Sequence, residues 1–283
     1  TSQEDLNRRS KAASFIGTLQ AGYTDFHYLR PIWKETTQKD ALIGVGMTGI
    51  GSGAVLKYDL RQAAEAVVEE NARVAKLLGI NPAARTTTVK PSGTSSLVCG
   101  SASGIHAWHN DYYIRRMRLG KDEALYTYLK EHIPALVEDD QFNPLGAIAS
   151  FPQKAPEGSI LRHETPQELL ERVRMFNSDW VRHGHGNGDN THNVSCTISV
   201  KDDEWQMISE WMWNNRHDYN GISVLPYNGG TYVQAPFEDI DRETFIEMEK
   251  HLTAINLADI REDTNNTNHG QELACAGGVC EIF

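Results

Sequence analysis

One stretch places hydroxyl side chains and a glycine directly after an expected strand. The β-branched run of residues 86–89 favours a strand, and a proline and a glycine then stop it and turn the backbone. The turn consists of Pro91, Ser92, Gly93, Thr94 and Ser95. Its backbone N–H groups and hydroxyls, with the positive end of a following helix, suit an anion such as phosphate. An ordinary strand, turn and helix with a serine cap fits the same spacing.

Two cysteines near the carboxyl end could carry out redox chemistry. Cys275-Ala-Gly-Gly-Val-Cys280 places its thiols on a short glycine-containing loop, close enough to form a disulfide. The preceding residues 259–272 are nearly all polar, which predicts disorder, and roughly 15 extended residues reach about 50 Å. Thiols on such a segment can visit a buried site and then exchange with a reductant in solvent. A zinc site would need a second pair of ligands.

A loop rich in histidine and glycine is a further candidate. His183, His185 and His192, with Asp189, carry donor atoms that can ligate a metal ion. The glycines between them leave these ligands without fixed positions, which is more typical of a pocket rim with tight turns. We therefore expect no metal site here.

The other thiols and a basic cluster have simpler interpretations. Cys99 and Cys196 follow apolar residues on or near expected strands, which is typical of buried and unreactive cysteines. Arg115, Arg116, Arg118 and Lys121 lie close together and could help to neutralise the charge of a nucleotide. A solvated strand face is the commoner meaning of such a cluster, and we favour it.

Composition excludes several classes of protein. The chain has 283 residues, of which 40% are hydrophobic and 23% charged, as in soluble globular proteins. A net charge of −11 argues against a nucleic-acid partner, although local backbone amides can still bind a nucleotide. No apolar run approaches the roughly 20 residues of a membrane span, and no signal peptide is recognisable. We expect a cytoplasmic protein and, because the sequence begins at Thr1, a fragment or a processed product.

Helices and strands alternate along the chain, which predicts an α/β fold with parallel strands. Residues 23–33 are expected to form a packed connection and residues 139–160 a long surface loop. Strands are expected near residue 43 and at residues 86–89, 192–200 and 221–227; helices are expected at residues 2–21, 59–79, 122–133, 203–216, 241–256 and from residue 165 to about residue 180.

Several motifs together identify a family. They are Lys90-Pro-Ser-Gly-Thr-Ser-Ser, Ser103-Gly-Ile-His, Tyr112-Tyr-Ile-Arg-Arg, residues 182–197, Asp202-Asp-Glu-Trp, Glu210-Trp-Met-Trp, Ser223-Val-Leu-Pro-Tyr, residues 229–239 and the Cys-x4-Cys tail. In combination they closely resemble the large catalytic chain of ribonucleotide reductases. Within that family the sequence is similar to the adenosylcobalamin-dependent, monomeric type, from about Ile43 to the end of the chain.

The resemblance implies a fold and an activity. Residues 1–258 would contribute the later strands of the ten-stranded α/β barrel, and residues 259–283 a flexible redox-active tail. The turn from Pro91 to Ser95 would hold the substrate phosphates, and Cys275 with Cys280 would deliver electrons from a thioredoxin-like reductant. The reaction would be the radical reduction of ribonucleoside di- or triphosphates for DNA synthesis, with adenosylcobalamin as the cofactor. The residues that bind this cofactor are not located.

The sequence also departs from the family. The Asn-x-Cys-x-Glu pattern of the radical-bearing cysteine is absent, and so is the cysteine pair inside the barrel. An upstream, N-terminal part of the reductase would have to supply them, so the chain alone is expected to be inactive. Leu225-Pro226 stands where iron-dependent relatives carry adjacent tyrosines, which favours the cobalamin type. A non-catalytic nucleotide-binding or thiol-carrier subunit remains the alternative.

Overall fold

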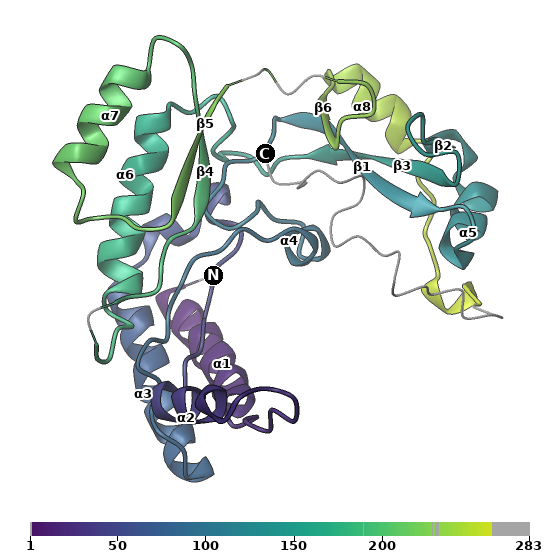
Figure 1. Cartoon of the computed structure of the whole chain (residues 1–283). Coiled ribbons are helices and arrows are strands. Elements are labelled where there is room, and N and C mark those ends of the chain that lie inside the picture. The colour runs from purple at the N-terminus through teal and green to yellow at the C-terminus, as the bar shows by residue number, and fades with distance from the viewer. Residues whose placement is uncertain (1, 189, 228, 230–231, 262–283) are drawn as a thin grey trace. The chain divides into compact units, whose positions relative to one another are not determined.

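The computed structural model describes residues 2–188, 190–227, 229 and 232–261 (Figure 1). These residues form two compact units. Of the described residues, the first unit contains 2–108, 158–188 and 190–227, and the second contains 109–157, 229 and 232–261. The range 1–258, expected as one part of a barrel, therefore contains segments of both units. The tail cysteines Cys275 and Cys280 lie outside the described residues.

Parallel strand pairs run through the first unit in chain order. Val45 bridges Thr87, and Val89 bridges Val194, both in the parallel sense. Strands β4 and β5 continue the series as a parallel pair. The unit is built from α1 (Gln3–Ala21), α2 (Pro31–Asp40), α3 (Leu60–Leu78), α4 (Thr94–Val98), α6 (Pro166–Phe176), α7 (Trp205–Asn214), β4 (Cys196–Val200) and β5 (Ile222–Pro226). The expected parallel α/β arrangement is confirmed for this unit.

Two long helices begin where the sequence places their caps. Asp59 accepts hydrogen bonds from the backbone N–H groups of Arg61 and Gln62 and so starts α3. Gly79 ends that helix in the left-handed conformation, with φ of 69°. Thr165 forms a capping box at the start of α6. A short π-helix, residues 177–181, follows α6.

The main core lies between the parallel strands and the helices α3 and α6. Trp180 and Phe176 are its largest fully buried side chains. The indole Nε1–H of Trp180 donates to the backbone oxygen of Thr88 at 3.1 Å, which fixes the π-helix against the strand at residues 86–89. Gly184 lies so close to this strand that a Cβ atom there would overlap the Thr87 side chain.

The second unit contains an antiparallel sheet, which differs from the parallel strands expected from the sequence. Its strand order is β2-β3-β1-β6. Leu119 and Tyr128 belong to its separate small core. The unit is built from β1 (Tyr112–Gly120), α5 (Ala124–His132), β2 (Val137–Asp139), β3 (Gly146–Lys154), β6 (Phe237–Asp239) and α8 (Arg242–Glu249).

Two expectations about connecting segments are wrong. The expected surface loop at residues 139–160 contains β3, which pairs with β1 along nine residues from Gly146 to Lys154. Its small residues and internal Pro152 are typical of a loop. The segment is nevertheless a strand, because it pairs with β1 on one edge and with β2 on the other. The expected packed connection at residues 23–33 is exposed, with Tyr28 99% accessible, and α2 begins at Pro31.

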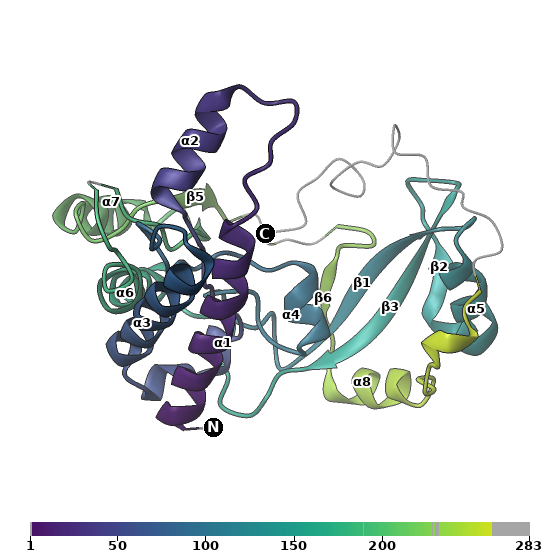
Figure 2. The ribbon, with the colours of Figure 1, turned by 90° about the horizontal axis from the view of Figure 1, so that it is seen from below.

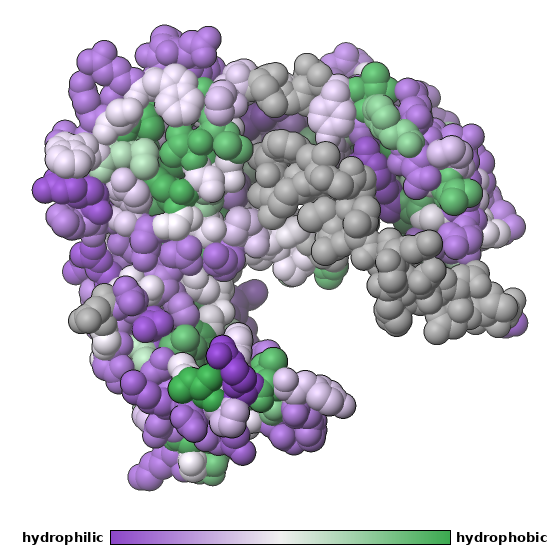
Figure 3. All heavy atoms as spheres, in the orientation of Figure 1, coloured by the Kyte–Doolittle hydropathy of each residue, from purple (hydrophilic) through white to green (hydrophobic). Residues whose placement is uncertain are grey.

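Helix α1 buries polar side chains and exposes apolar ones. Ser14 donates to the backbone oxygen of Val67 at 2.8 Å, and Thr18 accepts from Asn71 at 2.8 Å, so the polar face packs on α3 (Figure 2). Phe15 and Ile16 are exposed on α1. No residue of α2 is buried, and hydrophobic atoms reach the surface over both helices (Figure 3). Helix α1 thus carries apolar side chains that the described residues leave partly exposed.

Among the described helices, none combines the length and the apolar character that a membrane crossing requires.

We expect Gly184→Ala to lower the free energy of unfolding by about 3 kcal/mol, near the upper end of the usual cost of overpacking. The added methyl group must displace Thr87, whose hydroxyl donates to the backbone oxygen of Trp180 at 2.7 Å. Urea unfolding followed by tryptophan fluorescence measures the change. Gly93→Ala is the matched control, because no atom lies within 4 Å of the added methyl group. Equal stability of the two variants would contradict this account of the strand contact.

Candidate functional site

The hydroxyl turn forms as the sequence predicts. It follows the strand segment at residues 86–89, and α4 starts at Thr94. The backbone N–H of Ser92 donates to Ser103 Oγ at 2.8 Å, and the backbone N–H of Ser96 donates to Ser92 Oγ at 2.9 Å. Ser92 Oγ and Ser95 Oγ are also hydrogen-bonded to each other. These bonds give the turn a defined backbone course.

The outer side of the turn is open. A Cβ atom placed on Gly93 meets no other atom within 4 Å. Within the described part of the chain, the backbone N–H groups of Gly93 and Ser95 have no hydrogen-bond partner. Two amides and neighbouring hydroxyls therefore remain available to an anion that approaches from the open side.

A second loop holds the turn from behind. Gly104 has φ of +54°, and a Cβ atom there would lie 2.5 Å from the backbone oxygen of Lys90. The Thr48 hydroxyl donates to the backbone oxygen of Ala102 at 2.8 Å and accepts the N–H of Gly104 at 3.2 Å. Only glycine fits at this close approach, so the loop at residues 99–106 is fixed to the start of the turn.

His106 extends this hydrogen-bonded network to β4. Its Nδ1 lies 3.2 Å from the backbone oxygen of Ser103. Its Nε2 accepts the backbone N–H of Thr197 at 3.1 Å. Burial is the main cause that lowers the pKa of His106 from its ordinary value of 6.5. In the sequence, His106 stands out only as the last residue of the Ser103-Gly-Ile-His motif, and no local pattern indicates a role for it.

A buried ion pair lies beside this network. Arg172 makes two hydrogen bonds to Glu164, at 2.8 and 2.7 Å, and donates to the backbone oxygen of Ile105 at 3.3 Å. Both side chains are nearly inaccessible. Cys196 is also buried, and burial raises the pKa of its thiol to about 12. Cys196 is therefore a neutral thiol at physiological pH, as expected.

The expectation for Cys99 is wrong, because this residue is exposed. It follows α4 instead of lying on a strand, and its backbone N–H donates to the carbonyl of Ser95 at 3.1 Å. The apolar residues before it belong to a five-residue helix, which offers too little surface to bury the thiol.

The histidine-rich loop contacts backbone oxygens. His192 Nε2 lies 2.8 Å from the carbonyl of Ile43, and His185 Nε2 lies 2.7 Å from that of Gly188. Asp189 lies outside the described residues. Among the described residues, this loop included, no group of three or more His, Cys, Asp or Glu side chains is placed to hold a metal ion.

The arginines of β1 are not a solvated strand face, so that expectation is wrong. Arg116 pairs with Glu238 at 2.5 Å, and Arg118 pairs with Asp140 at 3.3 Å. Arg115 is buried and stacks on the Phe237 ring at 4.4 Å. The cluster neutralises carboxylates within its own unit, which leaves little charge for a nucleotide.

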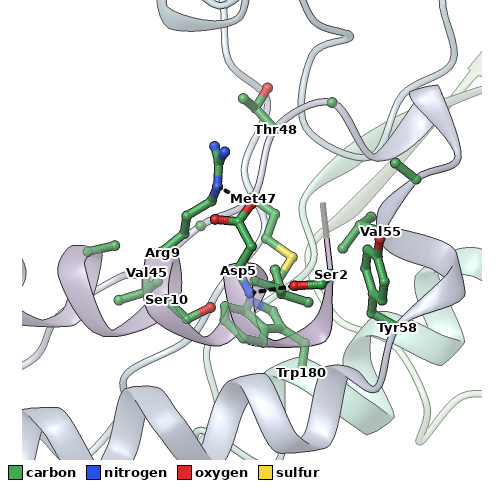
Figure 4. Close-up of a pocket in the computed structure, with 15 residues that line it drawn as sticks. Ser2, Asp5, Arg9, Ser10, Val45, Met47, Thr48, Val55, Tyr58 and Trp180 are labelled. Atoms are coloured by element: carbon green, nitrogen blue, oxygen red, sulfur yellow. Dashed lines mark hydrogen bonds and ion pairs between the residues drawn. The ribbon is translucent and has the colours of Figure 1, made fainter.

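A cavity of about 360 Å³ lies between α1 and the glycine-containing loop that follows Val45 (Figure 4). Asp5 and Arg9 contribute an ion pair at its rim, with a distance of 3.0 Å. Thr48 lines the cavity and also joins the loop behind the hydroxyl turn. Trp180 forms part of its wall. The cavity thus begins at the carboxyl end of one of the parallel strands.

Comparison with known proteins identifies similar sequences and one similar fold. The chain is 30% identical over 233 residues to an adenosylcobalamin-dependent ribonucleoside-triphosphate reductase of Lactobacillus gasseri, which covers 77% of this chain and 29% of that relative. A protein of the same name from Lactobacillus acidophilus is 28% identical over 296 residues, with 90% of this chain and 38% of the relative covered. No family model matches the sequence.

The fold is also that of a solved structure. The crystal structure of a B12-dependent (class II) ribonucleotide reductase superimposes with a TM-score of 0.74 and 24% identity. The match covers 88% of this chain and 38% of that chain. The chain therefore spans less than two fifths of the length of these relatives.

We expect the two described cysteines to differ sharply in reactivity. In the folded chain at pH 8, iodoacetamide should label Cys99, because its thiol is exposed. Cys196 should react only after unfolding, since burial and a pKa of about 12 leave very little thiolate. Mass spectrometry of the proteolytic peptides reports the labelling at each position. Similar labelling of both residues in the folded chain would refute the buried position of Cys196.

Proposed function

We propose that this chain forms the carboxyl-terminal part of the catalytic chain of a reductase. It belongs to the adenosylcobalamin-dependent ribonucleotide reductases by its similarity over about nine tenths of its length. In the complete enzyme it would take part in reducing ribonucleoside di- or triphosphates to deoxyribonucleotides. The observation that supports this best is the hydroxyl turn at residues 91–95, which combines an open glycine with hydroxyls and available amides.

Phosphate binding at the turn requires no cationic side chain. Pro91 sets the direction of the chain, and Ser92 to Ser95 supply hydroxyls and backbone N–H groups. Gly93 lets the phosphate oxygens approach the backbone, because no side chain stands in front of it. This explains how a chain with a net charge of −11 can bind a highly charged anion.

The parallel strands of the first unit support a role as the later strands of the ten-stranded barrel. The segments at residues 43–45, 86–89 and 194–200 and strand β5 follow one another in chain order. The carboxyl ends of two of them lead into the loop at residue 48 and into the hydroxyl turn. Ligands of parallel α/β sheets bind at such ends.

Adenosylcobalamin, which the names of the similar reductases include, would supply the radical chemistry when bound. The cavity of about 360 Å³ is smaller than a corrinoid, so it does not fit this cofactor. We assign no residue of the described chain to the cofactor and derive no step through it. The cysteine that would carry the radical also belongs to the upstream part of the reductase.

The upstream part has a place to bind. Ile16 and Trp33 are 65% and 51% exposed on α1 and α2, and the curated relatives are more than twice as long as this chain. Exposed apolar surface of this kind typically marks an interface. We propose that the amino-terminal part of the reductase covers these helices, and that the chain alone is inactive.

The tail cysteines would supply the electrons. Reduced Cys275 and Cys280 would exchange with a disulfide formed at the reacting site, which restores the two thiols there and leaves the tail pair oxidised. A thioredoxin-like dithiol in the cytoplasm would then reduce the tail disulfide. The alternative is a nucleotide-binding or thiol-carrier subunit without catalysis, which the missing radical motif favours.

Gly93→Val tests the phosphate turn. In the complete enzyme that contains this chain, the side chain should occupy the open side of the turn and weaken nucleotide binding at least about tenfold, or about 1.4 kcal/mol. Isothermal titration calorimetry with each ribonucleotide measures the affinity. Gly93→Ala is the graded control and should have a smaller effect. Unchanged affinity in a folded Gly93→Val enzyme would exclude phosphate binding at this turn.

The tail is tested by Cys275→Ser and Cys280→Ser in the complete enzyme. Multiple turnovers with thioredoxin should be lost, because the disulfide exchange needs both thiols. A single turnover of pre-reduced enzyme should be retained, and dithiothreitol should partly restore turnover. Wild-type turnover with thioredoxin would show that the tail carries no electrons. The chain without its upstream part should form no deoxynucleotide when it is assayed with adenosylcobalamin. Recombination with the upstream part should produce this activity if the chain belongs to the catalytic enzyme, and should not if it is a non-catalytic subunit.

A further inference from the structure

The two ring nitrogens of His106 face backbone groups of fixed polarity. Nδ1 lies against the carbonyl oxygen of Ser103, which can only accept a hydrogen bond, so Nδ1 must carry the proton. Nε2 faces the N–H of Thr197, which can only donate, so Nε2 must be unprotonated. Only the neutral Nδ1–H tautomer makes both bonds.

These bonds connect β4 to the hydroxyl turn. Thr197 lies in β4, in parallel register with Ser223 of β5, and is therefore fixed by the sheet. His106 joins Thr197 to Ser103, and Ser103 Oγ accepts the backbone N–H of Ser92 at 2.8 Å. A continuous path of three hydrogen bonds thus runs from the sheet to the first hydroxyl residue of the turn.

We propose that His106 is a positioning residue, which holds the hydroxyl turn in its phosphate-binding form only while the ring is the neutral Nδ1–H tautomer. Protonation would place a second donor against the N–H of Thr197 and break the path at that point. Phosphate affinity would then fall in acid although His106 does not touch the ligand. This inference rests on the proposed function of the turn.

The surroundings of the ring favour its neutral form. Burial is the largest cause that lowers the pKa of His106 below 6.5, and the positive charge of Arg172 on α6 acts in the same direction. Glu164 faces Arg172 and is bound to it by two hydrogen bonds. Cys196 of β4 is a neutral thiol because its pKa is about 12. These surroundings keep the pKa of His106 below its ordinary value and so favour the neutral ring.

The first measurement is the tautomer. We expect the imidazole ¹⁵N resonances of His106 in the histidine-labelled chain to show Nδ1–H and to titrate with a pKa below 6.5. Assignment uses the His106→Asn variant, from which these resonances are missing. An Nε2–H tautomer, or a pKa above 6.5, would overturn the inference without involving any ligand.

The second measurement uses inorganic triphosphate as the probe of the turn in the complete enzyme, between pH 5 and pH 8. In His106→Asn the side-chain amide can still donate to Ser103, but nothing accepts the N–H of Thr197. We expect about fivefold weaker binding at pH 8, the effect of one lost hydrogen bond. As wild-type His106 becomes protonated, the ratio of the two affinities should approach one. Taking this ratio at each pH cancels the ionisation of the triphosphate itself.

His132→Asn is the matched control, because His132 lies in α5 of the second unit and bonds to the backbone oxygen of Tyr128. Its affinity ratio to wild type should stay near one at every pH. A wild-type to His106→Asn ratio that is constant with pH would overturn the inference and leave the phosphate turn in place. Absence of triphosphate binding by the wild type at pH 8 would overturn the turn assignment and, with it, the role of His106.

Discussion

The first unit depends on the close packing of the threonine strand at residues 86–89 against its neighbours. The three buried threonine hydroxyls donate to backbone oxygens of three other residues: Thr86 to Gly184, Thr87 to Trp180 and Thr88 to Asn193, at 2.7 to 2.9 Å. A buried hydroxyl without a partner costs free energy, so each bond fixes a segment far away in the chain. The strand is thereby held along its edges and on one face. The hydroxyl turn follows this strand directly, so the fixed position of the strand also fixes the start of the turn.

The phosphate site proposed for the turn would let a strongly acidic chain bind an anion. A cationic side chain would be a mobile charge, whereas amides at the end of a fixed strand are preorganised donors. The glycine at residue 104 permits the loop behind the turn to approach Lys90, and the loop in turn provides the Ser103 acceptor. The site is thus assembled from neutral groups. Its geometry depends on hydrogen bonds in which every donor has a defined acceptor, and a histidine in that path makes the geometry sensitive to protonation.

The elements with local signals were predictable, and those that depend on distant pairing were not. Asp59 and the capping box at Thr165 start α3 and α6, and the turn at residues 91–95 was recognised from its own residues. The antiparallel unit was missed because β3 has small residues and a proline, and becomes a strand only by pairing with β1. The role of His106 was equally hidden. Its partner Thr197 lies 91 positions further along the chain, so no spacing indicates the contact.

The two chemical tasks of the proposed reductase place opposite demands on the structure. Phosphate binding needs a rigid site, and the site proposed in the first unit is held by buried hydroxyls, a glycine at a close approach and the His106 ring. Thiol exchange needs an accessible thiolate. Cys196, which interacts electrostatically with the buried Arg172 and Glu164 pair, does not meet that demand, because burial raises its pKa to about 12. Burial in the main core therefore keeps Cys196 from forming the thiolate that disulfide exchange requires. Cys99, the other described thiol of this unit, is exposed after α4, so within the described chain only this one of the two thiols meets the demand for access.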